Sequence, residues 1–568
     1  RGSPSYWKQM SMDMLAKIKH FGPYTFFITM SIADFHIPEV IKVIAHQYGT
    51  HLTNAEIKNM SWQQKRIWLM RNPVIAARHI DHIFGQIWKK CILSGLHPVG
   101  KILNWDGRGE AQLRGEFHTH NAIHCVGAPV LTDEKNEEND RIVAKYVELY
   151  CDTCIPDEAE EPELNYLVLH RQTHHHTRSC KKYKKADCRH GYPKLPSDKT
   201  IISRKLLGED GIQKTKWARE ILSKVMSIMK QTGTDITLDE LLTEAEITKD
   251  DYEKASEISL KRTSIILKRK PNETSINPYN PVILRAMRSN MDIQYITDVW
   301  ACIAYITSYM CKPERNMSEM MNAAVKEAPT QREKLKAVGD TLCKSREISQ
   351  HEAVYRALGD LMPLRRSNRK VKFFQTAVKE KRTYMTKPHA LLVNMEDDDT
   401  NVRVAGIIDQ YQSRPRGKFE KLCYIEFGCY YEKTAKHLIE KDIEVEDSDG
   451  DSDVETPDDE SMKDLPKSIK LQNELGYMRK RKTPYIPRFH NVSRQKDAET
   501  FFHRILISYL PWRCEDELKS HGTYENTFNH FRDTVMHNLK KYEPFADEVE
   551  FALETASDPS EHGEEMWD

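Results

Sequence analysis

Two histidines separated by one residue, His118 and His120, have the type and spacing to hold a metal ion. In a β-strand, side chains i and i+2 project from the same face, so both imidazoles could bind one divalent cation. Two ligands leave room for a third protein ligand and for a substrate. Gln112 or Glu110, themselves two residues apart, could supply that third ligand from a neighbouring strand. The alternative is a pair of histidines that only form hydrogen bonds within a strand.

Two tyrosines and a lysine form a second candidate group. Tyr305, Tyr309 and Lys312 follow the spacing i, i+4 and i+7, which places both phenols and the ammonium group on one stripe of a helix. A phenol with an ordinary pKa is a poor nucleophile at neutral pH, so it needs activation. A metal that polarises a phosphate and a nearby lysine could provide it. A tyrosine stripe is equally typical of a helix that packs into a core.

A third group combines histidines with cysteines. The chain contains 12 cysteines, and its first residues show no signal-peptide h-region, so we expect a reducing compartment and metal binding in preference to disulfides. Crowded imidazole and thiol ligands between polar loops suit a tetrahedral Zn²⁺ site. The preferred ligands are His174, His176, Cys180 and Cys188, with Cys151, Cys154 and His190 in reserve. The alternative is a basic, histidine-rich surface loop.

The net charge of the chain is zero, but the chain outside one acidic stretch is basic. The 568 residues carry 85 basic and 85 acidic side chains, but residues 440–460 contain twelve acidic residues and one lysine. The rest of the chain therefore carries 84 basic and 73 acidic side chains, which permits phosphate contacts. The acidic stretch is typical of a disordered linker. No run of 18 apolar residues is present, so we expect no membrane span.

Basic runs next to aromatic residues are candidates for contacts with single-stranded nucleic acid. The candidate DNA-binding residues are Arg114, Lys181, Lys182, Arg365, Arg366, Arg369 and Lys370. Such runs are also common on solvated faces. The run at 479–482 could equally be a nuclear-import signal, and we expect a nuclear protein.

Hydrophobic patterns predict the elements that position these groups. We expect strands over 24–31 and 117–126, and another β-like run over 421–431. We expect a long helix over 291–311 and a helix that starts with a capping box at Thr237.

Taken in order, these motifs resemble the replication-initiator (Rep) segment of Helitron transposases, the rolling-circle elements of eukaryotes. The stretch 112–120 is similar to the one that ends in that family's His-hydrophobe-His (HUH) motif, and 172–180 with 188–193 is similar to its Cys/His segment. The stretches 277–281 and 305–312 are similar to its paired-tyrosine region. Thr119 departs from the usual bulky hydrophobe, but it is compatible with a strand.

The resemblance implies an α+β protein with a Rep-like HUH catalytic domain: an antiparallel sheet flanked by helices, with a zinc-binding segment and added helical regions. The implied segments are the first half of the Rep domain (1–130), an acidic loop with the zinc segment (131–200), a helical insertion (201–275), the second half of the Rep domain (276–345), a C-terminal extension (346–439), an acidic linker (440–465) and a final helical segment (466–568).

The resemblance also implies chemistry. His118, His120 and Gln112 would hold Mg²⁺ or Mn²⁺, and Tyr305 or Tyr309 would attack single-stranded DNA at transposon ends to form a 5′-phosphotyrosine. The partners implied are single-stranded DNA and a helicase domain of the full-length protein, although no Gly-x-x-x-x-Gly-Lys-Ser/Thr motif is present. The alternative is a zinc-containing, non-catalytic module that binds single-stranded DNA.

Overall fold

The computed structural model describes residues 4–32, 38–111, 117–132, 134–177, 180, 188, 190–206, 208–260, 262–306, 310–311, 323–326, 329–344, 348–375, 382, 384–395, 402–417, 419–435, 466–489, 492, 494–495 and 497–555. The chain divides into two compact units, which are described separately: residues 1–11, 23–368 and 555–568, and residues 12–22 and 369–554. Helix α1 (Pro4–Phe21) contributes to both. The acidic stretch 440–465 lies outside the described residues.

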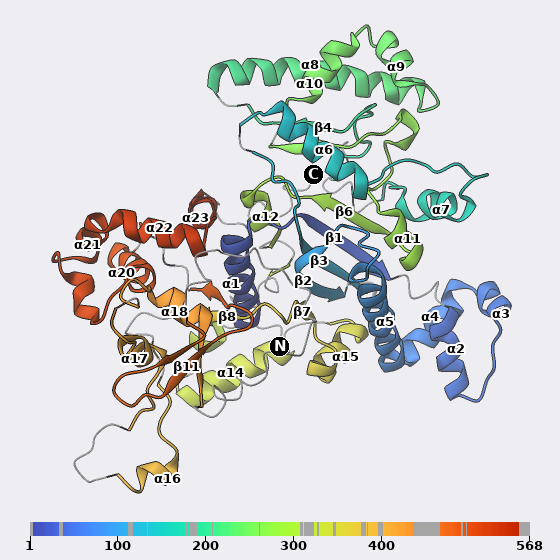
Figure 1. The fold of residues 1–568 in the computed structure, drawn as a ribbon. Helices are drawn as coiled ribbons and strands as arrows, with labels where there is room; N and C mark the ends of the chain where they lie inside the picture. Colours follow the sequence, from blue (N-terminus) through green and yellow to red (C-terminus); the bar gives the residue numbers. More distant parts are fainter. Residues whose placement is uncertain are drawn as a thin grey trace, which may run out of the picture. The chain divides into compact units, whose positions relative to one another are not determined.

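The first unit is built around a five-stranded sheet (Figure 1). Its order is β6 (Met291–Tyr295), β1 (Phe26–Ile32), β3 (Phe117–Cys125), β2 (Ile102–Ala111) and β7 (Arg365–Ser367). Every neighbouring pair is antiparallel. The central strand β3 is buried along its whole length.

Because side chains alternate along a strand, the register gives each face of the sheet a different character. In the strand register, Thr29 of β1 and Arg108 of β2 lie opposite His120 of β3. Glu110 of β2 lies opposite His118, so all five polar residues share one face of the sheet. The aromatic ring of Tyr305, in α12 (Val299–Tyr305), packs against this face.

The other face of the sheet is covered by helices. Phe84 of α5 (Pro73–Ile87) and Trp88 of the following π-helical turn η2 (Trp88–Ile92) line a small hollow together with Gly107 and Gly109. A Cβ atom on Gly109 would collide with the ring of Phe117. The glycines of β2 therefore leave room for the aromatic residues that pack on this face.

The first unit also contains other helices, helical turns and short strands. They are α2 (Pro38–Gln47), α3 (Asn54–Asn59), α4 (Trp62–Arg71), α6 (Glu137–Tyr150), α7 (Pro162–Leu167), η3 (Val168–Gln172), β4 (Ile201–Ser203), α8 (Gly208–Thr232), α9 (Leu238–Glu244), α10 (Lys249–Ser256), β5 (Ser264–Ile266), η5 (Pro271–Glu273), α11 (Pro281–Met287), α14 (Gln331–Lys344), α15 (Gln350–Leu358) and η7 (Gly359–Leu361). Helices α8–α10 share a small apolar core of their own. Thr237 and Glu240 form the expected capping box at α9, which confirms that prediction.

The second unit has a separate core of aromatic and aliphatic side chains. Its elements are β8 (Phe373–Gln375), α16 (His389–Leu392), α17 (Ile407–Gln412), α18 (Tyr424–Tyr430), β9 (Tyr431–Thr434), β10 (Ser468–Lys470), β11 (Tyr477–Lys480), β12 (Ile486–Arg488), α20 (Ala498–Tyr509), η10 (Glu515–Lys519), α21 (Tyr524–His530), α22 (Arg532–Tyr542) and α23 (Ala546–Thr555). In the part of the chain that the structure describes, no helix combines the length and apolar character needed to span a membrane.

Two predicted elements are wrong. The stretch 291–311 forms strand β6 followed by the short helix α12, because Met291 and Ile293 alternate with polar residues and Asp298 caps a new helix. The β-like run at 421–431 forms helix α18 over Tyr424–Tyr430. That helix is almost fully buried, so its apolar residues follow no single face.

Candidate metal centres

Three potential metal ligands meet on the polar face of the sheet: Glu110, His118 and His120. The Nε2 atoms of the two histidines lie 3.0 Å apart. Glu110 Oε2 lies 3.4 Å from His120 Nε2 and 3.8 Å from His118 Nε2. The cross-strand pairing of Glu110 with His118 produces this convergence, because residues opposite each other in adjacent strands project from the same face.

The donor set fits a divalent cation. Adjacent ligands of an octahedral ion with bonds of about 2.1 Å are about 3 Å apart, close to the separation of the two histidine nitrogens. Two imidazoles and one carboxylate on one side of an ion leave other positions open to water or substrate. Both histidines are buried, at 7% and 6% exposure, whereas the Glu110 side chain is 43% exposed. The ligand cluster therefore opens toward solvent at Glu110.

Electrostatics favours the ligand-competent forms of two of these residues. Burial and the neighbouring His120 lower the pKa of His118 to about 4, although Glu110 acts in the opposite direction. Burial raises the pKa of Glu110, but the hydrogen bond and charge of His120 and the charge of Arg108 outweigh it and lower that pKa to about 2. At neutral pH, His118 is therefore neutral and Glu110 is ionised, as metal binding requires.

One tyrosine of the predicted pair lies beside this cluster. Tyr305, the last residue of α12, is 5% exposed, and its ring stacks on Phe27 with 3.5 Å between centroids. Its hydroxyl oxygen lies 3.1 Å from His120 Nδ1. The hydroxyl oxygen of Thr29 lies 3.1 Å from the same nitrogen and 3.4 Å from Tyr305 Oη. Tyr309 and Lys312 lie outside the described residues.

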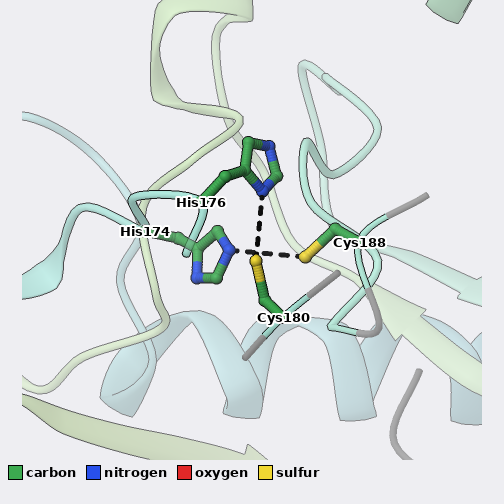
Figure 2. Close-up of side chains that lie close together, drawn as sticks. All are labelled: His174, His176, Cys180 and Cys188. Atoms are coloured by element: carbon green, nitrogen blue, oxygen red, sulfur yellow. Dashed lines mark hydrogen bonds between the residues drawn. The ribbon is translucent and has the colours of Figure 1, made fainter. Parts of the chain in front are cut away.

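The structure also brings together the four preferred zinc ligands, shown in Figure 2: His174, His176, Cys180 and Cys188. Cys188 Sγ lies 3.3 Å from His174 Nε2, and Cys180 Sγ lies 3.6 Å from His176 Nδ1. The edges of a tetrahedron around Zn²⁺ with Zn–S and Zn–N bonds measure about 3.5 Å, so these distances fit.

The protonation states of this cluster also favour a metal. Burial and the neighbouring His176 and His190 lower the pKa of His174 to about 4, so its imidazole is neutral. Burial raises the pKa of Cys180, but hydrogen bonds from Thr177 outweigh it, so this pKa is lowered.

The reserve ligands Cys151, Cys154 and His190 do not belong to the four-ligand cluster. Cys151 is buried at the C-cap of α6, and the backbone N–H of Cys154 donates to Asp152. The ring of His190 is 5.7 Å from that of His174.

Hydrogen bonds connect the Cys/His segment to the edge of the sheet. The fully buried amide of Gln172 donates to the Met291 carbonyl at 2.9 Å and accepts from the Met291 N–H at 3.1 Å. The backbone of Gln172 accepts from Asn277, and His174 donates to Ser275. Gln172, two residues before His174, is therefore bound directly to β6.

The candidate DNA-binding residues are scattered. Arg365 of β7 lies opposite Arg108 of β2 in the strand register, on the polar face of the sheet. Arg366 instead forms an ion pair with Asp81 of α5. Arg369 and Lys370 are exposed at the start of the second unit. Arg114, Lys181, Lys182 and the predicted third metal ligand Gln112 lie outside the described residues.

The sequence analysis did not predict two residues of the site, Thr29 and Arg108. Arg108 lies opposite His120, and its guanidinium group is 4.1 Å from the centre of the Trp7 ring. The signal for Arg108 is the alternation Asp-Gly-Arg-Gly-Glu over 106–110, which puts three charged residues on one face of a strand. Thr29 gives no such signal, because only strand pairing brings it to His120.

Comparison with known proteins identifies one family. Residues 1–123 match the family described as the Helitron helicase-like domain at the N-terminus. The matched residues include Glu110, His118 and His120, and also strand β1, which pairs with β3. No curated protein matches the chain. The chain is thus Helitron-related through the region that carries the Glu110–His118–His120 cluster, which suggests a transposase-related function.

Proposed function

We propose that the chain is the Rep segment of a Helitron-like transposase, with a Rep-like HUH catalytic domain that cleaves and rejoins single-stranded DNA. The observation that carries the proposal is the position of a tyrosine hydroxyl 3.1 Å from a histidine of a three-ligand cluster. The Helitron relationship of residues 1–123 supports DNA as the substrate and a helicase domain as a partner. A DNA substrate and the basic run at 479–482 favour the nucleus as its location.

Glu110, His118 and His120 would hold Mg²⁺ or Mn²⁺, and the ion would supply Lewis-acid polarisation of a scissile phosphate. The tyrosine oxygen attacks phosphorus as its proton leaves. An O–P bond to tyrosine forms, the bond from phosphorus to the 3′-oxygen breaks, and that oxygen takes up a proton. The products are a 5′-phosphotyrosine and a free 3′-hydroxyl, and the energy of the broken ester bond is conserved.

Tyr305 and Tyr309 are both candidates for the nucleophile. In the DNA-free protein the Tyr305 hydroxyl contacts His120 Nδ1, so it would have to move toward the phosphate when DNA binds. Two tyrosines allow one to retain the first DNA end while the other cleaves a second strand, which suits strand transfer better than simple nicking. Arg108, on the same face as the ligand cluster, carries a positive charge that would favour an approaching phosphate.

His174, His176, Cys180 and Cys188 would hold Zn²⁺ in a structural role. Two thiols and two imidazoles complete a tetrahedral shell, so this site leaves no open position for a substrate.

The test is incubation of the protein with labelled single-stranded DNA that carries transposon ends, in the presence of Mn²⁺, followed by a denaturing gel. Wild type is compared with Tyr305→Phe, Tyr309→Phe and the double variant. Tyr166→Phe, at an exposed tyrosine of α7, serves as the matched control. We expect a covalent protein–DNA band that only the double variant loses.

Other outcomes identify the competing functions. Cleavage without attachment, retained in the double variant, would indicate a hydrolytic nuclease that uses water. Binding without cleavage on genuine transposon ends would indicate a non-catalytic, zinc-containing DNA-binding module.

A further inference from the structure

Three polar atoms form a triangle on the side of His120 that faces away from Glu110: its own Nδ1, Thr29 Oγ1 and Tyr305 Oη. Both oxygens lie 3.1 Å from Nδ1 and 3.4 Å from each other. The Nε2 atom of the same ring lies 3.0 Å from His118 Nε2 and 3.4 Å from Glu110 Oε2. The two ring nitrogens therefore contact different groups.

An imidazole that binds a metal through Nε2 carries its proton on Nδ1, and the partner of that N–H fixes the orientation of the ring. At His120 this N–H has two acceptors at equal distance. We propose that Thr29 and Tyr305 are paired positioning residues that share the Nδ1–H of His120 and so keep its Nε2 lone pair directed toward the metal. The inference rests on the proposed function, because it concerns the same metal site.

Both acceptors are held firmly. Thr29 is the cross-strand partner of His120, and a β-branched side chain in a strand has few rotamers. Tyr305 is fixed by its stacking on Phe27. Neither hydroxyl needs to move in order to reach Nδ1.

His118 provides an internal contrast. Its Nδ1 is buried and has no hydrogen-bond partner among the described residues. His118 is therefore contacted through Nε2 alone among the described residues, whereas both ring nitrogens of His120 have polar contacts. Of the two rings, His120 is the one whose metal affinity should respond to loss of a hydroxyl.

One N–H with two acceptors also predicts redundancy. Loss of one hydroxyl leaves the other in place, so each single substitution should have little effect. Loss of both removes the two hydroxyl oxygens that lie 3.1 Å from the buried Nδ1. Substitution of such outer partners typically lowers metal affinity about 10- to 100-fold.

The test measures the Kd for Mn²⁺ without DNA, from the electron paramagnetic resonance signal of the free ion. Thr29→Val preserves the shape of the side chain and removes its hydroxyl, and Thr29→Ser retains the hydroxyl. We expect Thr29→Val and Tyr305→Phe each to raise Kd by at most about threefold, and the two together about 10- to 100-fold. Thr29→Ser combined with Tyr305→Phe should bind like Tyr305→Phe alone.

The inference is overturned if the Thr29→Val, Tyr305→Phe double variant binds Mn²⁺ like wild type. It is also overturned if Thr29→Ser weakens binding as much as Thr29→Val in the Tyr305→Phe background. Equal zinc content and equal thermal midpoints show that all variants are folded.

Failure of the proposed function gives a different result. A wild-type protein that binds Mn²⁺ and shows the expected pattern of affinities, yet forms no covalent DNA adduct, would contradict the nuclease and leave the positioning roles intact. Adduct formation together with unchanged Mn²⁺ affinity in the double variant would contradict only the positioning roles.

Discussion

The two ligand clusters of the first unit differ in chemistry and in how the chain builds them. His174, His176, Cys180 and Cys188 lie within 15 residues of each other, and their sulfur and nitrogen atoms all lie within 4.8 Å of one another. Glu110, His118 and His120 project from two paired strands, and three such ligands would leave other positions of an ion open. A closed shell of soft ligands suits a structural zinc, and an open shell of harder ligands suits a catalytic metal.

The two clusters show two ways to bring ligands together. A short stretch of sequence supplies the His174–His176–Cys180–Cys188 cluster, and strand pairing assembles the Glu110–His118–His120 cluster. We expect the loop cluster to depend on a bound ion for its shape, because its four ligands come from one short segment and not from paired strands. The strand cluster is shaped by the hydrogen bonds of the sheet, so its ligands should keep their positions without a metal. Four variants would break or sharpen this contrast.

The largest effect is expected at the loop cluster. Cys180→Ser combined with Cys188→Ser should remove one tightly bound Zn²⁺ per chain, because two of its four ligands are lost. Binding of a structural zinc contributes about 10–16 kcal/mol in small zinc peptides, so the segment should also become sensitive to proteases. Elemental analysis and limited proteolysis would detect both changes.

The matched control is Cys514→Ser, because Cys514 is an exposed cysteine of the second unit. Full zinc content in the Cys180→Ser, Cys188→Ser variant would show that other residues hold the ion.

The second effect is expected at the strand cluster. His120→Ala should abolish the covalent DNA adduct but retain zinc and most DNA binding, because β3 remains paired on both sides. A denaturing gel and elemental analysis on the same sample would separate the two clusters. His170→Ala, at an exposed histidine outside both clusters, is the control. Full activity of His120→Ala would exclude it as a metal ligand.

A smaller effect should identify the third ligand of the strand cluster. Glu110→Gln removes the negative charge that lies 3.4 Å from His120 Nε2, so Mn²⁺ affinity should fall at least about tenfold. Titration calorimetry with Mn²⁺ would measure it. The comparison variant is Gln112→Ala. Weaker binding in Gln112→Ala together with unchanged binding in Glu110→Gln would assign the third position to Gln112.

The smallest effect concerns β6, the strand to which the Cys/His segment is bound. Burial raises the pKa of Asp292 to about 6 from an ordinary 3.8, despite the hydrogen bond from Gln294 and the charge of Lys194. The unfolded chain loses this proton at lower pH than the folded chain, so stability falls as pH rises from about 4 to 6.

Asp292→Asn should therefore raise the free energy of unfolding at pH 8 by roughly 1–3 kcal/mol, and with it the thermal midpoint. At pH 4 both quantities should be nearly unchanged. Thermal melts at the two pH values would measure the difference. Asp235→Asn, at an exposed aspartate, should show no such dependence on pH. An equal gain at both pH values would mean that the ionised carboxylate is not what destabilises the strand.

Local sequence patterns predicted elements better than their arrangement. The capping box at Thr237 depends only on residues three positions apart, and the structure contains it. The predicted helix over 291–311 was wrong for its first residues, which form strand β6. The five residues of β6 alternate in polarity, but the prediction included them in the helix that follows. The predicted strand over 421–431 failed because a buried helix and a buried strand have equally continuous apolar sequences.

By itself, the sequence determined which residues could do chemistry: a histidine pair at strand spacing, a tyrosine stripe, and a histidine–cysteine cluster close enough in sequence for a short loop to bring together. Only the tertiary structure decided that Glu110 joins the histidine pair, that Thr29 and Tyr305 meet at His120 Nδ1, and that Arg366 pairs with Asp81. The physical reason is that these contacts join residues up to 285 positions apart. They depend on strand register and helix packing, which local sequence spacing does not specify.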